Sequence, residues 1–326
     1  MKICSNGTSV QSTDHLNLNH KIFKREFMSN LPGIHLQQVN SHGETAFDLI
    51  NVDNAFCQAQ IACQGAQVLY YRQKNPQLKS RTELLWLSEK NQFNGQKAIR
   101  GGIPLCFPWF GAHPQQKSYP AHGFARNLIW HLQQITFDEQ TGHTLQFILK
   151  DDAYTRQYWD YAFELQMTIF CGTTLEIALE VKNLDQKPFD FTFAWHSYFS
   201  ITHIQNIQIS GFEHTQFIDQ LLPETKFFQE NHVINISQET DRIYPVACGQ
   251  YQILDQDTVI TIDSLQAKSS VVWNPWIEKT KRLNDVAEDA WQKFVCVECG
   301  QIGQPIILPV GQSQTFYLTL TRKNHQ

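Results

Sequence analysis

A histidine within an otherwise apolar strand pattern is the first residue able to do chemistry. In FDFTFAWHSYF, residues 189–199, phenylalanine and tryptophan at odd positions alternate with more polar residues at even ones. Neighbouring residues of a β-strand face opposite sides, so we expect His196 on the more polar face of a core strand. A histidine titrates near neutral pH and can give or take a proton there. The alternative is a histidine satisfied by nearby backbone or hydroxyl groups.

Glu298 is the second candidate, because it closes the apolar run FVCVECG at residues 294–300. Burial raises the pKa of a carboxyl toward the range useful to a general base. The alternative is a glutamate at a strand end that turns toward water. Cys296 and Cys299 form a CxxC in the same run, but residues three apart on a strand face opposite ways. No second CxxC exists, so we expect neither a zinc site nor a redox pair.

Two arginines bracket the irregular stretch IRGGIPLCFPWFGAHPQQKSYPAHGFAR at residues 99–126. The guanidinium forks of Arg100 and Arg126 suit phosphate or carboxylate, and Gly101-Gly102 permits close approach of the backbone to a ligand. The stretch also contains aromatic residues that could wall a pocket or stack on a sugar: Phe107, Trp109 and Phe110. The alternative is a long loop whose aromatic residues cap the core and whose arginines pair with surface acids. No P-loop is present, because no GxxxxGK[ST] follows.

Two smaller groups complete the candidate set. Asp241 and Arg242 in ETDRIYP could contact ligand hydroxyls or form a solvated pair in a turn. Trp273 and Trp276, around Asn274-Pro275, form a rigid aromatic turn that could line a pocket or pack in the core.

Period-2 alternation predicts the strands that must position these residues. It runs through residues 145–149, 163–169, 175–181, 189–195, 259–262, 270–273, 294–298 and 315–321. The second and third of these segments are joined by a short turn containing glycine, which predicts a β-hairpin. The best helical candidate is Lys281–Lys293. Many short strands predict an all-β sandwich or barrel, with residues 31–326 as one domain behind a polar N-terminal arm at residues 1–30.

Composition narrows the class of protein. The chain has 326 residues with 26 Lys+Arg against 31 Asp+Glu, a net charge of −5, so a nucleic-acid partner is not expected. It has no run of 18 apolar residues and no signal-peptide core, so no membrane span or secretion is expected. Eight irregularly spaced cysteines fit reduced, buried thiols and predict a cytoplasmic location.

Together these segments resemble the D-hexose-6-phosphate mutarotases, the glucose-6-phosphate 1-epimerase branch of the aldose 1-epimerase superfamily. The matching pieces, in the family's order, are IRGGIPLCFPWFG, PAHGFAR, FAWHSYF, DRIY, VVWNPW and FVCVECG. The resemblance implies a galactose mutarotase-like supersandwich with few short helices. It also implies interconversion of the α and β anomers of a hexose 6-phosphate without a cofactor, a metal or an obligate protein partner.

The resemblance assigns the roles residue by residue. It implies His196 and Glu298 as the catalytic acid and base, His122 and Asp241 as sugar contacts, and Arg100 and Arg126 as phosphate ligands. Ring opening then needs a proton delivered to the ring oxygen by His196 and one removed from the anomeric hydroxyl by Glu298. Phe107, Trp109 and Trp273 are expected in the pocket wall. The alternatives are an aldose 1-epimerase for unphosphorylated sugars and a non-catalytic carbohydrate-binding module; a glycosidase is disfavoured because no acid–nucleophile carboxylate pair is evident.

Overall fold

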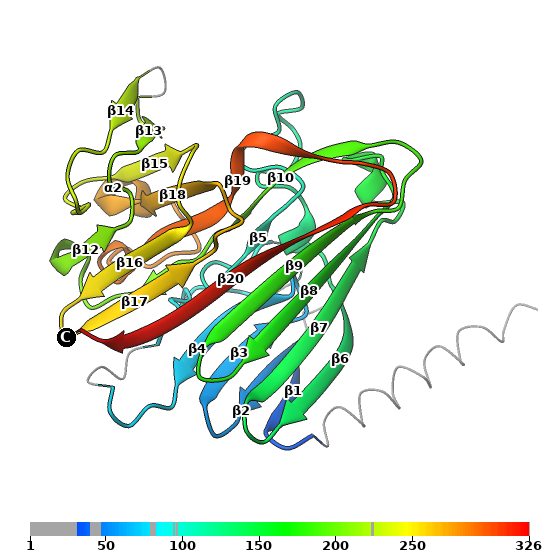
Figure 1. Ribbon diagram of the computed structural model, residues 1–326, viewed down its shortest axis with the longest axis horizontal. Coiled ribbons are helices and arrows are strands. Elements are labelled where there is room, and N and C mark those ends of the chain that lie inside the picture. Colours follow the sequence, from blue (N-terminus) through cyan, green and yellow to red (C-terminus); the bar gives the residue numbers. More distant parts are fainter. Residues whose placement is uncertain are drawn as a thin grey trace, which may run out of the picture.

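The computed structural model describes residues 31–39, 47–78, 83–93, 95, 97–222 and 225–325. The arm expected at residues 1–30 lies outside this part of the chain. The described strands form three sheets, in which every neighbouring pair is antiparallel (Figure 1). The smallest sheet has the order β1 (Ile34–Val39), β2 (Phe47–Asp53), β3 (Cys57–Ala62) and β4 (Gln67–Gln73).

The first large sheet has eight strands and carries Asp241, Trp273 and Glu298. Its order is β14 (Lys226–Phe228), β13 (Gln216–Asp219), β15 (Thr240–Tyr244), β18 (Ser269–Asn274), β19 (Phe294–Leu308), β10 (Phe189–Trp195) and β5 (Leu105–Cys106). The eighth strand, β11 (Tyr198–Ser200), continues the line of β10 and also pairs with β19.

The second large sheet also has eight strands and includes β20, which runs the length of the molecule in red in Figure 1. Its order is β12 (Ile207–Ser210), β16 (Gln250–Asp255), β17 (Thr258–Asp263), β20 (Ser313–Asn324), β9 (Leu175–Asn183), β8 (Phe163–Cys171), β7 (Gly142–Lys150) and β6 (His131–Asp138).

Helical structure is short in the described residues. It consists of α2 (Trp276–Thr280) and the 3₁₀ turns η1 (Ala125–Asn127), η2 (Thr155–Gln157), η3 (Ile204–Asn206) and η4 (Ala290–Gln292). None of these helices has the length and apolar content needed to span a bilayer.

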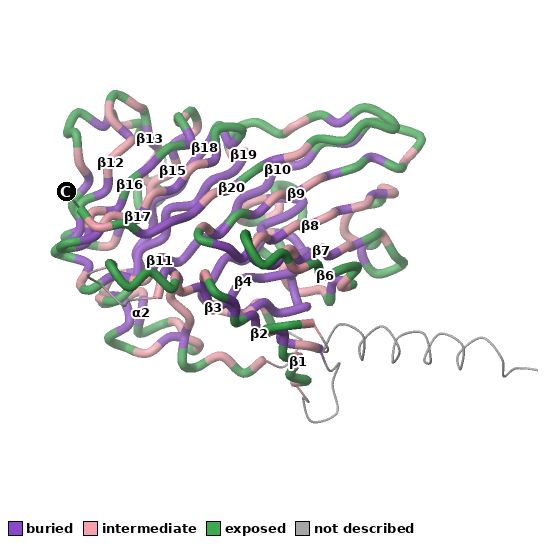
Figure 2. The backbone as a smooth tube through the Cα atoms, turned by 60° about the horizontal axis from the view of Figure 1, so that its bottom comes forward, coloured by how far each residue is buried: buried purple, intermediate pink, exposed green. Residues whose placement is uncertain are grey.

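The core lies where the two large sheets face each other. On β10 the odd-numbered residues are buried, and the rings of Phe191 and Phe193 pack on Phe316 of β20 with centroid separations of 6.3 and 4.3 Å. Figure 2 shows burial concentrated along the strands, with the connecting loops largely exposed. Because aromatic side chains bury much area and interlock across sheets, they fix the distance between the two layers.

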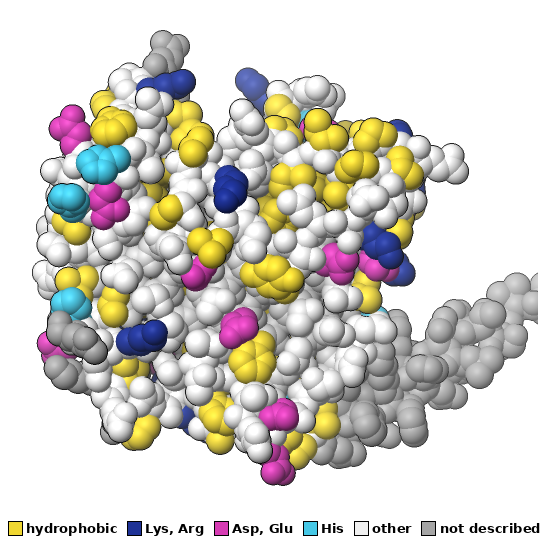
Figure 3. Space-filling view, in the orientation of Figure 1, with side chains coloured by type: hydrophobic (Ala, Val, Ile, Leu, Met, Phe, Trp, Pro, Cys, Tyr) yellow, Lys and Arg dark blue, Asp and Glu magenta, His cyan; other side chains and the backbone are white. Residues whose placement is uncertain are grey.

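The strand predictions are confirmed. Each of the eight alternating segments falls inside an observed strand, and β8 and β9 form the predicted hairpin. The surface agrees with the near-balanced charge, since Figure 3 shows Lys/Arg and Asp/Glu side chains scattered among one another on this face.

The helix predicted over Lys281–Lys293 is wrong. The α-helix in this segment is α2, Trp276–Thr280, which begins directly after Pro275, and the following residues form turns up to η4. Proline has a fixed φ and lacks an N–H, which suits a helix start. Downstream, the backbone carbonyl of Asp285 accepts a hydrogen bond from Ser88 Oγ, and the Asp285 carboxylate pairs with Arg100. These tertiary contacts hold the segment in a loop and override its helical pattern.

Candidate active site

Four of the candidate residues, His196, Asp241, Trp273 and Glu298, come together on the outer face of the first large sheet, because the strand register places them in two neighbouring rows. Along the first row, Asp241 of β15 pairs with Trp273 of β18, Trp273 pairs with Cys296 of β19, and Cys296 pairs with Tyr198 of β11. Side chains paired across antiparallel strands lie on the same face. Four residues from four distant segments of the sequence therefore form one line.

The second row contains the predicted acid and base. The register is the same at Trp195–Cys299 and at Tyr198–Cys296, so His196 lies opposite Glu298. Val295, Val297 and Cys299 belong to the central core, whereas Cys296 belongs to a smaller cluster on the outer face. This alternation places Glu298 on the same face as Cys296, whereas Cys299 lies on the opposite face, as predicted for residues three apart on a strand.

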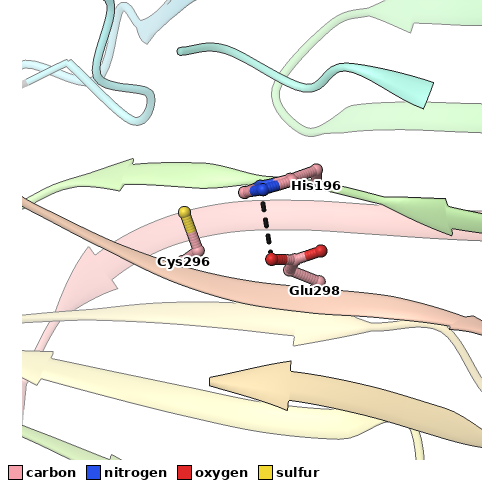
Figure 4. Close-up of side chains that lie close together, drawn as sticks. All are labelled: His196, Cys296 and Glu298. Atoms are coloured by element: carbon pink, nitrogen blue, oxygen red, sulfur yellow. Dashed lines mark ion pairs between the residues drawn. The ribbon is translucent and has the colours of Figure 1, made fainter. Parts of the chain in front are cut away.

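His196 and Glu298 form a buried pair. His196 Nδ1 lies 3.3 Å from Glu298 Oε1, and the two side chains are 9% and 2% exposed (Figure 4). The orientation does not give a hydrogen bond, and within the described residues His196 Nδ1 and Glu298 Oε2 have no hydrogen-bond partner. The imidazole stacks in parallel on the Tyr198 ring at 4.7 Å between centroids. Buried polar atoms without partners are uncommon and costly, so these two point to a polar ligand.

Burial lowers the pKa of His196 and raises the pKa of Glu298. Desolvation, and then the charges of His122 and the two arginines, hold the pKa of His196 well below 6.5. Desolvation raises the pKa of Glu298 well above 4.5; Asp241 raises it further, and Arg126 opposes the rise. Both shifts disfavour charge, because the pair is removed from water. Burial therefore acts against charge on both side chains.

His122 reaches the site from the irregular stretch and is fixed as a hydrogen-bond donor. Its ring lies 5.8 Å from that of His196, and its Nδ1 accepts a hydrogen bond from the backbone N–H of Gly111. Desolvation, with the charges of Arg126 and Arg100, lowers the pKa of His122 to about 3. Since the ring is neutral and Nδ1 accepts, the proton lies on Nε2, which can donate to a ligand.

Arg126 has the properties of a side chain that binds an anion. It is half-buried, its Nη2 donates to the carbonyl of Ala121, and its Nε is buried with no partner among the described residues. Among the described residues Arg126 makes no ion pair with a carboxylate, yet its charge lowers the pKa values of His122, His196 and Glu298. A guanidinium that is held in place and lacks a counter-ion suits phosphate.

Arg100 is already partly engaged. Its Nε pairs with Asp285 Oδ2 at 3.0 Å, and its Nη1 donates to the Tyr198 hydroxyl at 3.0 Å. The Tyr198 hydroxyl and the Asp285 carboxylate raise the pKa of Arg100 despite its burial. Arg100 thus combines the two interpretations of the sequence, since it pins the loop through Asp285 and also faces the site beside Tyr198.

Asp241 is held by a lysine that sequence analysis missed. Lys279 of α2 lies 3.3 Å from Asp241 and 3.2 Å from Glu239, and its Nζ is 5.8 Å from the centre of the Trp273 ring. Desolvation raises the pKa of Asp241, and Lys279 counteracts this. No spacing rule links Lys279 to Asp241, because only the pairing of β15 with β18 brings α2 over the site.

Tyr198 and Asp285 were also missed. The alternation that placed His196 on the outer face places Tyr198 there too, so the sequence held that signal. Asp285 carried none, because its pairing with Arg100 spans 185 positions.

Four expectations for individual residues are corrected. Phe107 has no exposed surface and packs among aromatic rings of the core. Trp109 packs on Phe124 within the loop, and its indole N–H donates to the carbonyl of Pro120. Neither residue lies in a pocket wall. The Gly101-Gly102 pair is needed for protein packing, because a Cβ at either position would lie 2.5 Å or less from a backbone carbonyl of residue 86 or 68. Arg242 stacks on Phe217, on the face opposite Asp241.

Comparison with known proteins identifies the class of sugar-converting enzyme to which this fold belongs. The sequence profile of the family described as aldose 1-epimerase matches residues 48–321. The chain belongs to the aldose 1-epimerase family and is an epimerase (mutarotase).

Individual relatives narrow the comparison. A protein from Salmonella typhimurium (strain LT2), named "Putative glucose-6-phosphate 1-epimerase", is 35% identical over 253 residues, which are 77% of this chain and 82% of the relative. The crystal structure of a "putative mutarotase" from Salmonella typhimurium has a TM-score of 0.82 at 30% identity and covers 94% of this chain and 100% of that one.

A more distant structure supports the fold alone. A galactose mutarotase related enzyme from Lactobacillus acidophilus has a TM-score of 0.66 at 15% identity, covering 85% and 97% of the two chains. The predicted galactose mutarotase-like sandwich is confirmed.

Proposed function

We propose that this epimerase interconverts the α and β anomers of D-glucose 6-phosphate, or of a closely related hexose 6-phosphate, with His196 and Glu298 as its acid and base. The observation that carries the proposal is the 3.3 Å separation of His196 Nδ1 and Glu298 Oε1, with buried, unpartnered polar atoms on both side chains. The ring oxygen and O1 are bonded to the same carbon, so an acid and a base that serve them must lie close together.

Ring opening moves two protons. Glu298 takes the proton from the O1 hydroxyl, His196 gives one to the ring oxygen, and the C1–O5 bond breaks to leave an open-chain aldehyde. Rotation about the C1–C2 bond presents the other face of the aldehyde, and closure reverses both transfers. Each positioned acid or base contributes on the order of 10² to 10⁴ in rate.

The electrostatics favour both transfers. The reacting form has an imidazolium and a carboxylate, and ring opening converts it to a neutral imidazole and a protonated carboxyl. Those are the forms that burial favours at His196 and Glu298. The charged starting pair is thus the less stable form of the buried site, its 3.3 Å contact offsets part of that cost, and burial then favours transfer of the two protons; closure restores the starting form.

The remaining residues bind and orient the sugar. His122 donates from Nε2 to a sugar oxygen, Asp241 accepts from hydroxyls, and Trp273 provides an apolar floor edge-on to His196 at 5.8 Å. Arg126 and Arg100 hold the 6-phosphate and so fix the ring between acid and base. Fixing the ring is necessary because the two transfers require O1 and the ring oxygen to be in register with Glu298 and His196.

Phosphate dependence tests the proposal. Mutarotation of glucose 6-phosphate and of glucose is followed by NMR exchange between the anomers, and we expect a much higher kcat/KM for the phosphorylated sugar. Equal values for both sugars would remove the phosphate assignment and leave an aldose 1-epimerase for free sugars.

A further inference from the structure

A third ligating side chain lies beside the acid and base. Cys296 and Glu298 are two residues apart on β19 and share its outer face, and His196 approaches from the link between β10 and β11 (Figure 4). One atom from each, the imidazole nitrogen, Sγ and a carboxylate oxygen, lie within 4.8 Å of one another, and all three residues are buried.

This cluster has the dimensions of a tetrahedral zinc site. Zinc binds sulfur at about 2.3 Å and nitrogen or oxygen at about 2.0–2.2 Å, which puts two ligands of one ion about 3.4–3.6 Å apart. The 3.3 Å between His196 Nδ1 and Glu298 Oε1 already matches this spacing. Because all three atoms lie within 4.8 Å of one another, no separation has to shorten by much more than about 1 Å.

Hydrogen bonding gives an independent indication that the cluster is built for a ligand. His196 Nδ1 and Glu298 Oε2 have no hydrogen-bond partner among the described residues, and their side chains are nine-tenths buried or more. Zinc would satisfy the imidazole nitrogen and the carboxylate at once.

We propose that His196, Cys296 and Glu298 form an inhibitory Zn²⁺ site. On binding, the thiol proton and the proton that burial favours on the Glu298 carboxyl pass to solvent; the sulfur coordinates as thiolate, Glu298 as carboxylate and His196 as a neutral ligand. Three protein ligands leave the fourth position open to water. The ion is not a cofactor of the reaction, because it occupies both groups that transfer protons. Binding is independent of the reaction, whereas inhibition rests on the proposed function.

The test separates binding from activity. Zn²⁺ is titrated into the metal-free full-length protein by calorimetry, Co²⁺ is titrated with detection of the sulfur-to-cobalt charge-transfer absorption, and anomer exchange is measured with and without Zn²⁺. We expect one ion per chain, the thiolate absorption band, and inhibition that a chelator reverses.

Cys296→Ser should keep the zinc-free rate, weaken Zn²⁺ binding at least about tenfold and abolish the cobalt band. Cys248→Ser, at an exposed thiol, and Cys299→Ala, at a buried thiol on the other face, should behave as wild type. Cys296→Ala and the cobalt spectrum of the wild type keep the test informative if Cys296→Ser does not fold. Wild-type affinity in both Cys296 variants, or no cobalt–thiolate band in the wild type, would overturn the site. A protein that binds zinc in this way but never interconverts anomers would refute the proposed function alone.

Discussion

Replacing Arg126 by methionine should reduce activity on the phosphorylated sugar selectively. Arg126 Nη2 is occupied by the Ala121 carbonyl, whereas its buried Nε has no partner in the described chain. At least one donor is therefore available for the proposed phosphate contact, and a hydrogen bond to a charged group contributes about 1.5–3 kcal/mol. At about 1.4 kcal/mol per factor of ten, kcat/KM for glucose 6-phosphate should fall about 10- to 150-fold.

The measured quantity is the ratio of kcat/KM for glucose 6-phosphate to that for glucose, obtained from NMR exchange rates. Methionine keeps the length and apolar character of the stem, so loss of packing should affect both sugars alike and cancel in the ratio. Arg126→Lys should recover part of the ratio through its charge. Arg100→Ala should also raise KM more for the phosphorylated sugar, but by a smaller factor, because Arg100 already binds Asp285 and Tyr198. If the two rates fall together in Arg126→Met, Arg126 is structural and the phosphate assignment fails.

Three further changes have definite signs. Glu298→Gln should raise the melting temperature, and the gain should widen as pH rises above 4.5. The raised pKa of Glu298 makes the wild-type native state bind more protons than its unfolded chain, so the wild type loses stability with rising pH. A gain in melting temperature that does not vary with pH would contradict the burial argument. His122→Asn should lessen the loss of stability as pH falls from 6.5 toward about 3, because the lowered pKa of His122 makes the unfolded wild-type chain bind more protons than the native state in that range. Asparagine tolerates the positive φ of residue 122. Chemical denaturation at several pH values measures the difference. Lys279→Met should raise KM for both sugars by less than about fivefold, because a partly exposed ion pair contributes about 0.2–1 kcal/mol, and a change confined to the phosphorylated sugar would make Lys279 a phosphate ligand.

The strands were predictable because each exposes one face to the core and one face outward. Period-2 alternation identified β10 and β19, and with them the faces that carry His196 and Glu298. Their pairing was not predictable from local pattern. The register that sets residue 196 opposite residue 298 depends on the meeting of segments a hundred positions apart.

The irregular stretch was harder to interpret because its residue types serve two purposes. Glycine and aromatic residues suit a ligand pocket, yet Gly101, Gly102 and Phe107 serve the packing of the loop against its own protein. The helix predicted over 281–293 does not form for a related reason, since Asp285 pairs with Arg100 and accepts a hydrogen bond from Ser88, two residues that are distant in the sequence. Resemblance to a family supplied roles that alternation alone left open.

The central claim is that His196 and Glu298 act as one acid–base unit on the hemiacetal. The most direct measurement is the anomer exchange rate of glucose 6-phosphate at saturation for Glu298→Gln, His196→Asn and the double variant, each checked for folding. Each single change should lower kcat about 10²- to 10⁴-fold with KM little altered, and the double variant should be scarcely worse than either one, because groups that act together are not additive. A wild-type rate in Glu298→Gln would contradict the account.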